Sequence, residues 1–353
     1  MKRVVADKIA SVARGSELAP ELRLSDEIPC EEGVLIAAEV LTAKTAYNTL
    51  ELTSGRMAPV NRGDVIVGAL GHRQALFGYS GEIPESLETG DVVQLLNLGG
   101  VLGRLTGSDP GRGAPFDCRV LGCVLSFPFL GERIGVPARV GWRRLLPDVR
   151  LEVGAIPVIA VAGTCMDSGK TVAASAIVSR LRHRGWVVDA FKATGVSLLR
   201  DVLSMEDAGA RQTRIFTDYG VVATTGRNAA PLAKSMLSDL ASDAPDVIVF
   251  ELGDGLMGAY GVQSILKDPD IKRALTAVVL SANDPVAAFG GVTLLRDVYG
   301  IEPAVVTGRA TDNRVGVQIA REQLGVAAVN AITDAETLGD LLVDRLAPSC
   351  VSS

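Results

Sequence analysis

The segment that most restricts the fold of this chain is a short apolar run that leads directly into a loop of small residues. The run Val158–Ala162 is followed by nine residues, Gly163 to Thr171, that read Gly-Thr-Cys-Met-Asp-Ser-Gly-Lys-Thr. A helical pattern then continues to Arg184. A bounded apolar run of this length is typical of a buried strand. The sequence therefore predicts a strand, a loop and a helix in direct succession.

The residue types in this loop are those that bind phosphate. Glycines let backbone N–H groups approach phosphate oxygens, and the helix that follows directs the positive end of its dipole toward them. A lysine and a hydroxyl at the end of the loop suit the β- and γ-phosphates and Mg²⁺. Five residues, where the usual motif has four, separate the two glycines. We predict a site for a nucleoside triphosphate with Mg²⁺, formed by Gly163, Thr164, Ser168, Gly169, Lys170, Thr171 and Val172.

Residues 151–353 alternate apolar runs with helical patterns. The runs are Val158–Ala162, Trp186–Phe191, Val247–Glu251, Ala277–Ser281, Ala304–Thr307 and Ala327–Asn330. The helical patterns are Thr171–Arg184, Ala229–Ser242, Ala287–Tyr299, Val315–Leu324 and Ala335–Leu346. This alternation predicts an α/β domain of the P-loop NTPase type, with a mostly parallel, doubly wound sheet.

Residues 1–150 have a different pattern. Short apolar runs are separated by turn signals such as Asn61–Asp64 and Thr89–Asp91, and residues 108–114 have the composition of a flexible loop. Runs of this length and spacing predict a small β-rich barrel or sandwich. We therefore expect two domains, 1–150 with its connector and 151–353.

The ends of the later runs supply further candidates, because ligands bind at the carboxyl ends of parallel strands. Lys192 could bind a second anion. Glu251 ends a hydrophobic run, so we favour it over Asp254 as a Mg²⁺ ligand, with Asp201 as a further candidate. We place Arg211 and Arg214 on a helix, from which they could clamp a phosphate or a carboxylate.

Composition limits the other classes of function. The net charge of −6 argues against a surface built mainly to bind nucleic acid. The scattered cysteines and two histidines show no zinc spacing. Asp7, Lys8 and Arg14 interrupt any signal-like apolar segment, and no apolar run has the length of a membrane span. We expect a cytoplasmic protein without a membrane partner.

Three segments, in order, resemble dethiobiotin synthetases. The Gly163–Thr171 loop has the five-residue gap of that family's G-T-D-x-x-x-G-K-T pattern, Phe191–Ser197 resembles F-K-P-x-x-x-G, and Glu251–Gly255 resembles E-G-A-G-G. The resemblance covers about residues 156–310. The same region is similar to the C-terminal domain of the D-glutamate N-acetyltransferase-like group, which shares Ala193-Thr194-Gly195. Cys165 replaces the family's loop aspartate, and the first 150 residues have no counterpart in a dethiobiotin synthetase.

The resemblance implies ATP, Mg²⁺ and a ligase-type reaction. A substrate carboxylate or carbamate attacks the γ-phosphate, and an amine opens the mixed anhydride. The substrate would be a small acid or amino acid, and the protein would be a dimer. Lys170 would stabilise the phosphoryl group together with Mg²⁺ on Thr171 and Glu251. Lys192 would hold the substrate carboxylate, and Asp167 would orient a nucleophile or the metal shell.

Three alternatives remain open. Polynucleotide kinases also place a β-rich domain before a P-loop domain, and Arg211–Arg214 resembles their lid. A nucleotide-dependent switch or chaperone would couple hydrolysis to a protein partner. Acyl transfer, as in the acetyltransferase-like group, is the third.

Overall fold

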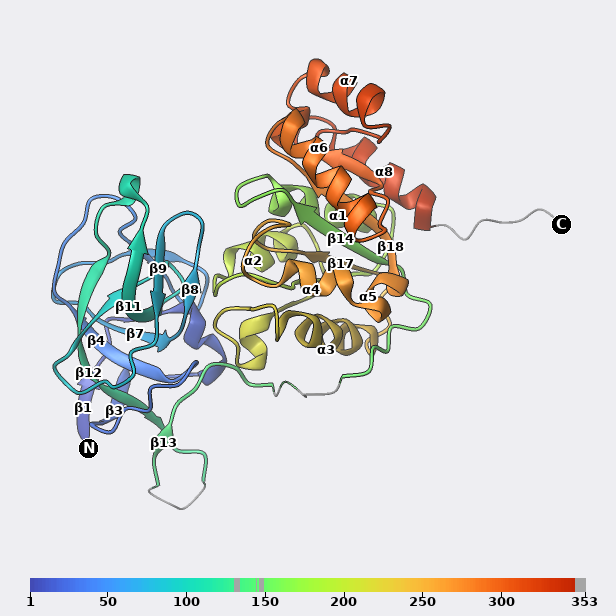
Figure 1. Cartoon of the computed structure of the whole chain (residues 1–353). Coiled ribbons are helices and arrows are strands. Elements are labelled where there is room, and N and C mark those ends of the chain that lie inside the picture. Colours follow the sequence, from blue (N-terminus) through green and yellow to red (C-terminus); the bar gives the residue numbers. More distant parts are fainter. Residues whose placement is uncertain (130–133, 144, 146–148, 347–353) are drawn as a thin grey trace. The chain divides into compact units, whose positions relative to one another are not determined.

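The chain folds as two compact units, each with a sheet of its own (Figure 1). The computed structural model describes residues 1–129, 134–143, 145 and 149–346. The β-rich unit contains Met1–Leu145 and two later segments, Val196–Arg200 and Phe216–Ala223. The α/β unit contains Leu146–Gly195, Asp201–Ile215 and Thr224–Ser353. The sequence predicted a single boundary between residues 150 and 151, and it did not predict that two later segments belong to the β-rich unit.

The β-rich unit is built around a closed ring of five strands. β4 (Leu35–Val40) pairs with β7 (Val65–Leu70) and β12 (Phe116–Ser126), while β10 (Val92–Leu95) pairs with β12 and β11 (Val101–Ser108). A parallel pairing of β7 with β11 closes the ring, so the unit contains a small barrel. The remaining strands are β1 (Lys2–Val5), β2 (Lys8–Ile9), β3 (Glu21–Ser25), β5 (Thr49–Glu51), β6 (Met57–Pro59), β8 (Arg73–Gln74), β9 (Tyr79–Glu82) and β13 (Val136–Pro137).

Segments from later in the chain complete the core of this unit. Val222 is fully buried within the barrel's hydrophobic cluster, and Val196 packs against that cluster. The buried carboxylate of Glu51 accepts hydrogen bonds from the backbone N–H groups of Leu199 at 2.7 Å and Arg200 at 2.9 Å. Because a buried carboxylate must be hydrogen-bonded, these contacts fix the 196–200 segment to the unit.

The α/β unit has a six-stranded sheet in which every pairing is parallel. Its order is β16 (Gln212–Ile215), β15 (Val188–Lys192), β17 (Val247–Glu251), β14 (Val158–Gly163), β18 (Leu275–Ser281) and β19 (Val305–Thr307). β14, β15 and β17 are buried along their whole length. Strands that are covered on both faces have continuous apolar sequences, which is why the apolar runs predicted the positions of these strands.

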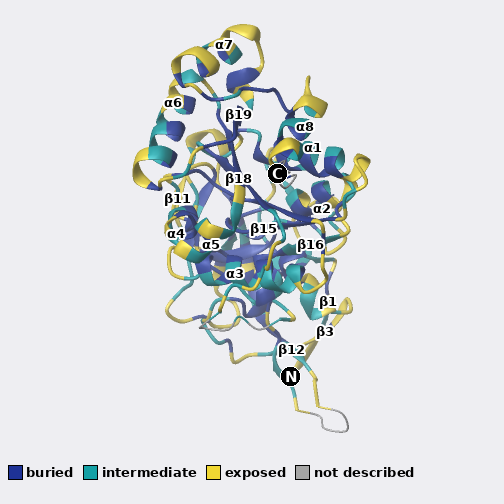
Figure 2. Ribbon diagram, turned by 90° about the vertical axis from the view of Figure 1, so that its right-hand side faces the viewer, coloured by how far each residue is buried: buried dark blue, intermediate teal, exposed yellow. Residues whose placement is uncertain are grey.

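Helices cover both faces of this sheet (Figure 1). α1 (Lys170–His183) and α8 (Ala335–Leu346) pack together on one face, and α3 (Ala229–Ala241), α4 (Val262–Lys267) and α5 (Pro269–Ala274) lie on the other. Figure 2 shows the strands buried and exposed residues on the outer sides of α6 (Pro285–Thr293) and α7 (Arg314–Gln323). α2 (Arg200–Asp207) is the remaining α-helix among the described residues. The architecture is the expected doubly wound α/β fold. None of the described helices has the length and apolar character needed to cross a membrane.

Two expectations about secondary structure are wrong. Arg214 lies within β16 and Arg211 directly precedes it, so neither is on a helix. The Arg211 guanidinium instead pairs with the buried Asp189 carboxylate at 2.5 and 3.0 Å, which anchors the edge strand. The run 327–330 forms one bridge, between Val306 and Ala328, in place of a strand.

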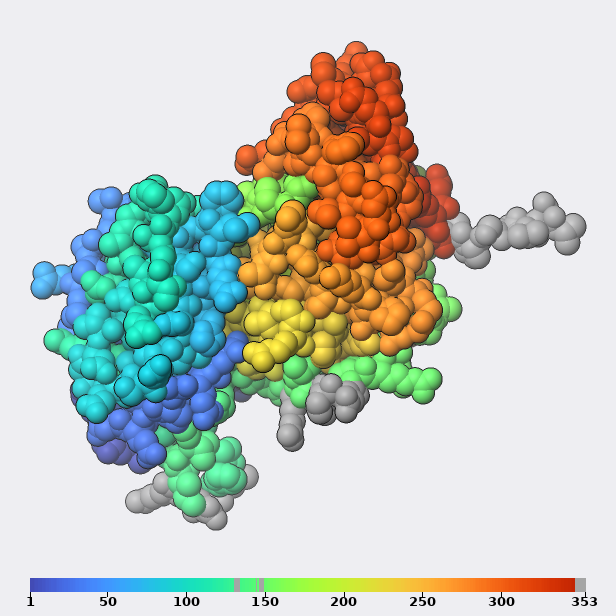
Figure 3. Space-filling view, in the orientation of Figure 1, coloured from blue at the N-terminus to red at the C-terminus, as the bar shows by residue number. Residues whose placement is uncertain are grey.

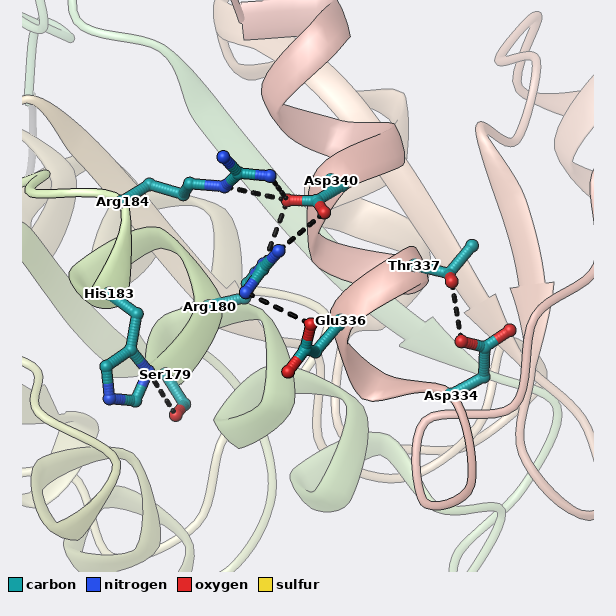
Figure 4. Close-up of polar contacts among 8 residues, drawn as sticks. All are labelled: Ser179, Arg180, His183, Arg184, Asp334, Glu336, Thr337 and Asp340. Atoms are coloured by element: carbon teal, nitrogen blue, oxygen red, sulfur yellow. Dashed lines mark hydrogen bonds and ion pairs between the residues drawn. The ribbon is translucent and has the colours of Figure 1, made fainter.

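A charged contact joins α1 to α8 (Figure 4). Arg180 binds both oxygens of Asp340 at 2.9 and 2.7 Å, and Arg184 adds contacts to Oδ1 at 3.0 and 2.8 Å. Hydrogen bonds from Arg180 and then from Arg184 lower the pKa of Asp340 to about 2. Asp340 therefore keeps its charge in the folded state at a pH where the unfolded chain takes up a proton.

We expect Asp340→Asn to lower the urea midpoint of unfolding at neutral pH. Since the folded pKa lies below the unfolded one, Asp340 stabilises the fold above about pH 4, and this contribution falls as the pH decreases toward 2. The difference between variant and wild type should be constant from pH 7 to 5 and shrink below about pH 4. Asp344→Asn, on the exposed side of the same helix, is the control. A difference that did not depend on pH would contradict the ion-pair explanation.

Candidate functional site

All six strands of the α/β unit end at one edge of its sheet, and their last residues are neighbours. Gly163 pairs in register with Ser281, which pairs with Thr307, and Lys192 pairs with Glu251. The parallel arrangement therefore brings together residues that are far apart in the sequence. This edge is where an open α/β sheet binds ligands.

The glycine-containing loop follows β14 and has a constrained backbone. Gly169 precedes α1 with a φ of 99°, and Asp167 has a φ of 55°. Only glycine adopts such values at no steric cost. A Cβ on Gly163 would lie 2.6 Å from Cδ of Lys170, so the lysine stem packs directly over this glycine. The loop is thus shaped so that its lysine folds back across it.

The neighbouring strand end holds the loop in place. The Thr164 N–H donates to the Ser281 carbonyl at 3.0 Å, and the Ser281 hydroxyl donates to the Ser168 carbonyl at 2.5 Å. The Asn283 side-chain amide donates to the sulfur of Cys165 at 3.0 Å. These contacts orient the loop before any ligand binds. Sequence reasoning missed this role of Ser281, because the residue marked only the end of an apolar run.

Lys170 is the first residue of α1 and is nearly fully buried, with 5% of its surface exposed. Its Nζ donates to the Cys165 carbonyl at 2.7 Å. Burial lowers the pKa of Lys170, and the charge of Glu251 acts in the opposite direction. A buried ammonium aimed into a loop of this kind is a strong electrostatic site for an anion.

A cluster of four polar residues lies next to the loop, formed by Lys192, Asp201, Thr171 and Glu251. Lys192 Nζ binds Asp201 Oδ2 at 2.5 Å, and the Thr171 hydroxyl donates to Asp201 Oδ1 at 3.4 Å. Glu251 is 2% exposed, and burial followed by the charge of Asp201 raises its pKa, although Lys192 and Lys170 act against the shift. The sequence named all four residues separately, and the structure places them together.

Buried polar atoms without a hydrogen-bond partner gather around the same loop. Among the described residues they include the hydroxyls of Thr164 and Ser168, Oε2 of Glu251 and Oδ1 of Asn283. Buried polar atoms in folded proteins are nearly always satisfied, so a group of exceptions needs an explanation. Their chemistry is that of a site that binds a polar ligand or a hydrated cation.

Two predicted residues lie apart from this cluster. Asp167 is exposed at the tip of the loop, and no hydrogen bond or ion pair joins its carboxylate to the other candidates in the described part of the chain. The Val172 side chain is 45% exposed on α1, so a contact with a ligand would come from its backbone. The roles predicted for both residues stay predictions.

Comparisons with known proteins find distant similarities. No family model matches the chain. A stretch of 186 residues is 28% identical to the ATP-dependent dethiobiotin synthetase BioD of Caulobacter sp. (strain K31), over 48% of this chain and 77% of that protein. Among solved structures, the chloroplast FtsY of Physcomitrella patens matches at 16% identity and a TM-score of 0.37, over 58% of this chain and 70% of that one. A duf1611 family protein from Anabaena variabilis matches at 15% identity and a TM-score of 0.40, over 58% and 62% of the two chains. The parallel sheet, with the glycine loop between β14 and α1, is a P-loop NTPase-like fold, and part of the chain is distantly similar to a dethiobiotin synthetase.

Proposed function

We propose that this protein is an ATP- and Mg²⁺-dependent enzyme of the ligase type, which activates a small carboxylate or carbamate by phosphoryl transfer. The observation that carries the proposal is the cluster of Lys192, Asp201, Thr171 and Glu251 directly behind a loop that buries Lys170. Two ammonium groups and two carboxylates suit a reaction between two anions, which requires charge neutralisation and positioning.

The residues present fit a magnesium ion that arrives with a nucleotide. No group of three or more His, Cys, Asp or Glu side chains in the described residues could hold a metal. Mg²⁺ commonly takes one or two protein carboxylates together with phosphate oxygens and water. Thr171, Glu251 and Asp201 would supply that small set, and the unpartnered Glu251 Oε2 agrees with it. The metal would neutralise phosphate charge.

Each residue of the site would then have a distinct task. The loop amides and Lys170 bind the β- and γ-phosphates. Lys192 holds the substrate carboxylate next to the phosphoryl group. Its ammonium group becomes available for this contact when Asp201 binds Mg²⁺ or its waters in place of Lys192. Asp167 orients the nucleophile or the metal-bound waters from the loop tip. These contacts neutralise the charges of the nucleotide and the substrate and hold both in a productive geometry.

The proposal is tested by ADP release from ATP·Mg²⁺ with a panel of small carboxylic acids, amino acids and oligonucleotides. We expect turnover that depends on a small acid and falls by about 100-fold in Lys192→Ala, since a lost charge-assisted contact weakens transition-state binding by about 1.5–3 kcal/mol. ATP binding should change little. Lys267→Ala, an exposed lysine of the same unit, is the matched control.

Other outcomes would replace the proposal. Turnover with oligonucleotides alone, lost at higher salt, would indicate a polynucleotide kinase. Slow hydrolysis that no panel member accelerates would indicate a switch that needs a protein partner. Turnover with a small acid that is unchanged in Lys192→Ala would remove Lys192 from the substrate site.

A further inference from the structure

The β-rich unit contains a pocket of about 610 Å³ that has no part in the proposed reaction. It lies between the segment Thr42–Ala46, after β4, and the loop Gly111–Pro115, which joins β11 to β12. In Figure 3 the β11–β12 region, coloured teal, lies at the surface of this unit. The volume is within the range typical of small-molecule sites. We call it the Lys44 pocket.

Aromatic rings surround the ammonium group of Lys44. Nζ lies 4.8 Å from the centroid of Tyr79, 5.5 Å from that of Phe116 and 5.9 Å from that of Tyr47. Lys44 also donates a hydrogen bond to the Tyr79 hydroxyl, which in turn donates to the Arg112 carbonyl at 3.2 Å. These contacts fix the position of the ammonium group in the pocket lining, and burial lowers the pKa of Lys44.

A second cation faces one of these rings. The Arg112 guanidinium carbon lies 5.0 Å from the centroid of Tyr47, so one ring contacts both Arg112 and Lys44. Neither cation forms an ion pair with a carboxylate in the described parts of the chain. Both residues line the pocket, so an anion bound there would complement their charge.

The acidic groups near the pocket are engaged elsewhere. Asp117 lines the pocket, but its Oδ1 accepts a hydrogen bond from Gln94 Nε2 at 3.0 Å. Asp109 accepts from the Gly111 N–H at 2.9 Å. The lining therefore carries two positive charges and one negative charge, a net excess of one positive charge. An oxyanion complements this charge.

We propose that the Lys44 pocket binds a small organic anion whose carboxylate or phosphate group contacts Lys44 and Arg112. The site lies entirely within the β-rich unit and does not depend on the proposed reaction. It would give that unit a ligand of its own. Lysine and arginine are both suited to oxyanions, arginine through its planar pair of donors.

The test uses the full chain and three probes: benzoate, its neutral counterpart benzamide, and inorganic phosphate. Backbone amide signals of Thr45, Gly111 and Gly113 are followed by NMR, because they report on this pocket and not on the glycine loop of the other unit. We expect benzoate or phosphate to shift these signals saturably and benzamide to leave them unchanged. Comparing the two anions distinguishes a carboxylate site from a phosphate site.

Lys44→Met keeps the apolar stem and removes the charge, so it should weaken anion binding by about tenfold or more. Lys2→Met, exposed on β1, should bind as wild type does. The proposal is overturned if neither anion shifts the three signals, if benzamide binds as well as benzoate, or if Lys44→Met binds as tightly as wild type. The comparison of benzoate with benzamide on the wild-type chain decides the matter even if the variant does not fold.

Discussion

Replacing Lys170 by methionine is expected to weaken binding of ATP·Mg²⁺ by about 100-fold or more. In the proposed function Lys170 contacts the β- and γ-phosphates, and charge-assisted hydrogen bonds contribute about 1.5–3 kcal/mol each. Methionine retains the stem that packs over Gly163, so the fold should remain. Calorimetric titration with ATP·Mg²⁺ measures the effect, and circular dichroism checks the fold.

The matched control for this change is Lys267→Met, which removes an exposed lysine from the same unit. Its affinity should equal that of the wild type. If Lys170→Met bound ATP·Mg²⁺ with unchanged affinity, the glycine loop would not be the nucleotide site and the proposed function would fall with it.

Glu251→Gln is expected to change activity and stability in opposite directions. The uncharged amide oxygen is a weaker magnesium ligand than a carboxylate, so Mg²⁺-dependent turnover should fall on the order of 100-fold. Burial raises the pKa of Glu251, so the ligand-free fold loses stability as the pH rises above the unfolded value toward the folded one. Glutamine carries no such cost, and the variant should have a higher free energy of unfolding at neutral pH.

Denaturant unfolding at pH 5 and pH 7.5, with and without Mg²⁺, tests this prediction. The gain in stability over wild type should be larger at pH 7.5. At that pH the Glu251 carboxyl of the unfolded wild-type chain is more fully ionised, whereas burial opposes its ionisation in the folded state. Glu322→Gln, at an exposed position on α7, serves as the control. A variant that is less stable than wild type and fully active would show that Glu251 is a structural acid and not a metal ligand.

The elements that the sequence predicted best are those whose burial is uniform. β17 and α8 have the expected bounds, and β14 differs by one residue, because both faces of those strands are covered and α8 has one clear apolar face. β16 was missed because Gln-Thr-Arg-Ile at the sheet edge is mostly polar. β3 likewise has no continuous apolar run, since its residues alternate between exposed and buried over only five positions.

The site was predicted in parts rather than as a whole. Lys192 and Asp201 were separate candidates, and their 2.5 Å contact depends on how α2 follows β15. The contacts of Ser281 and Asn283 with the loop join residues more than 110 positions apart. Local patterns cannot reveal such pairs, because only the strand order of the sheet brings them together. The Lys44 pocket has the same origin, because two loops 65 or more positions apart form its walls.

The interleaved path of the chain has a consequence for its synthesis. The chain passes from one unit to the other after residues 145, 195, 200, 215 and 223. Domains usually fold as units, the N-terminal one first, while the rest of the chain is still being made. Here the barrel lacks the buried Val222 and the partners of Glu51 until β14, α1 and β15 have already left the ribosome. The first unit can therefore complete its core only after much of the second has been translated, and the order of folding differs from the order of the sequence.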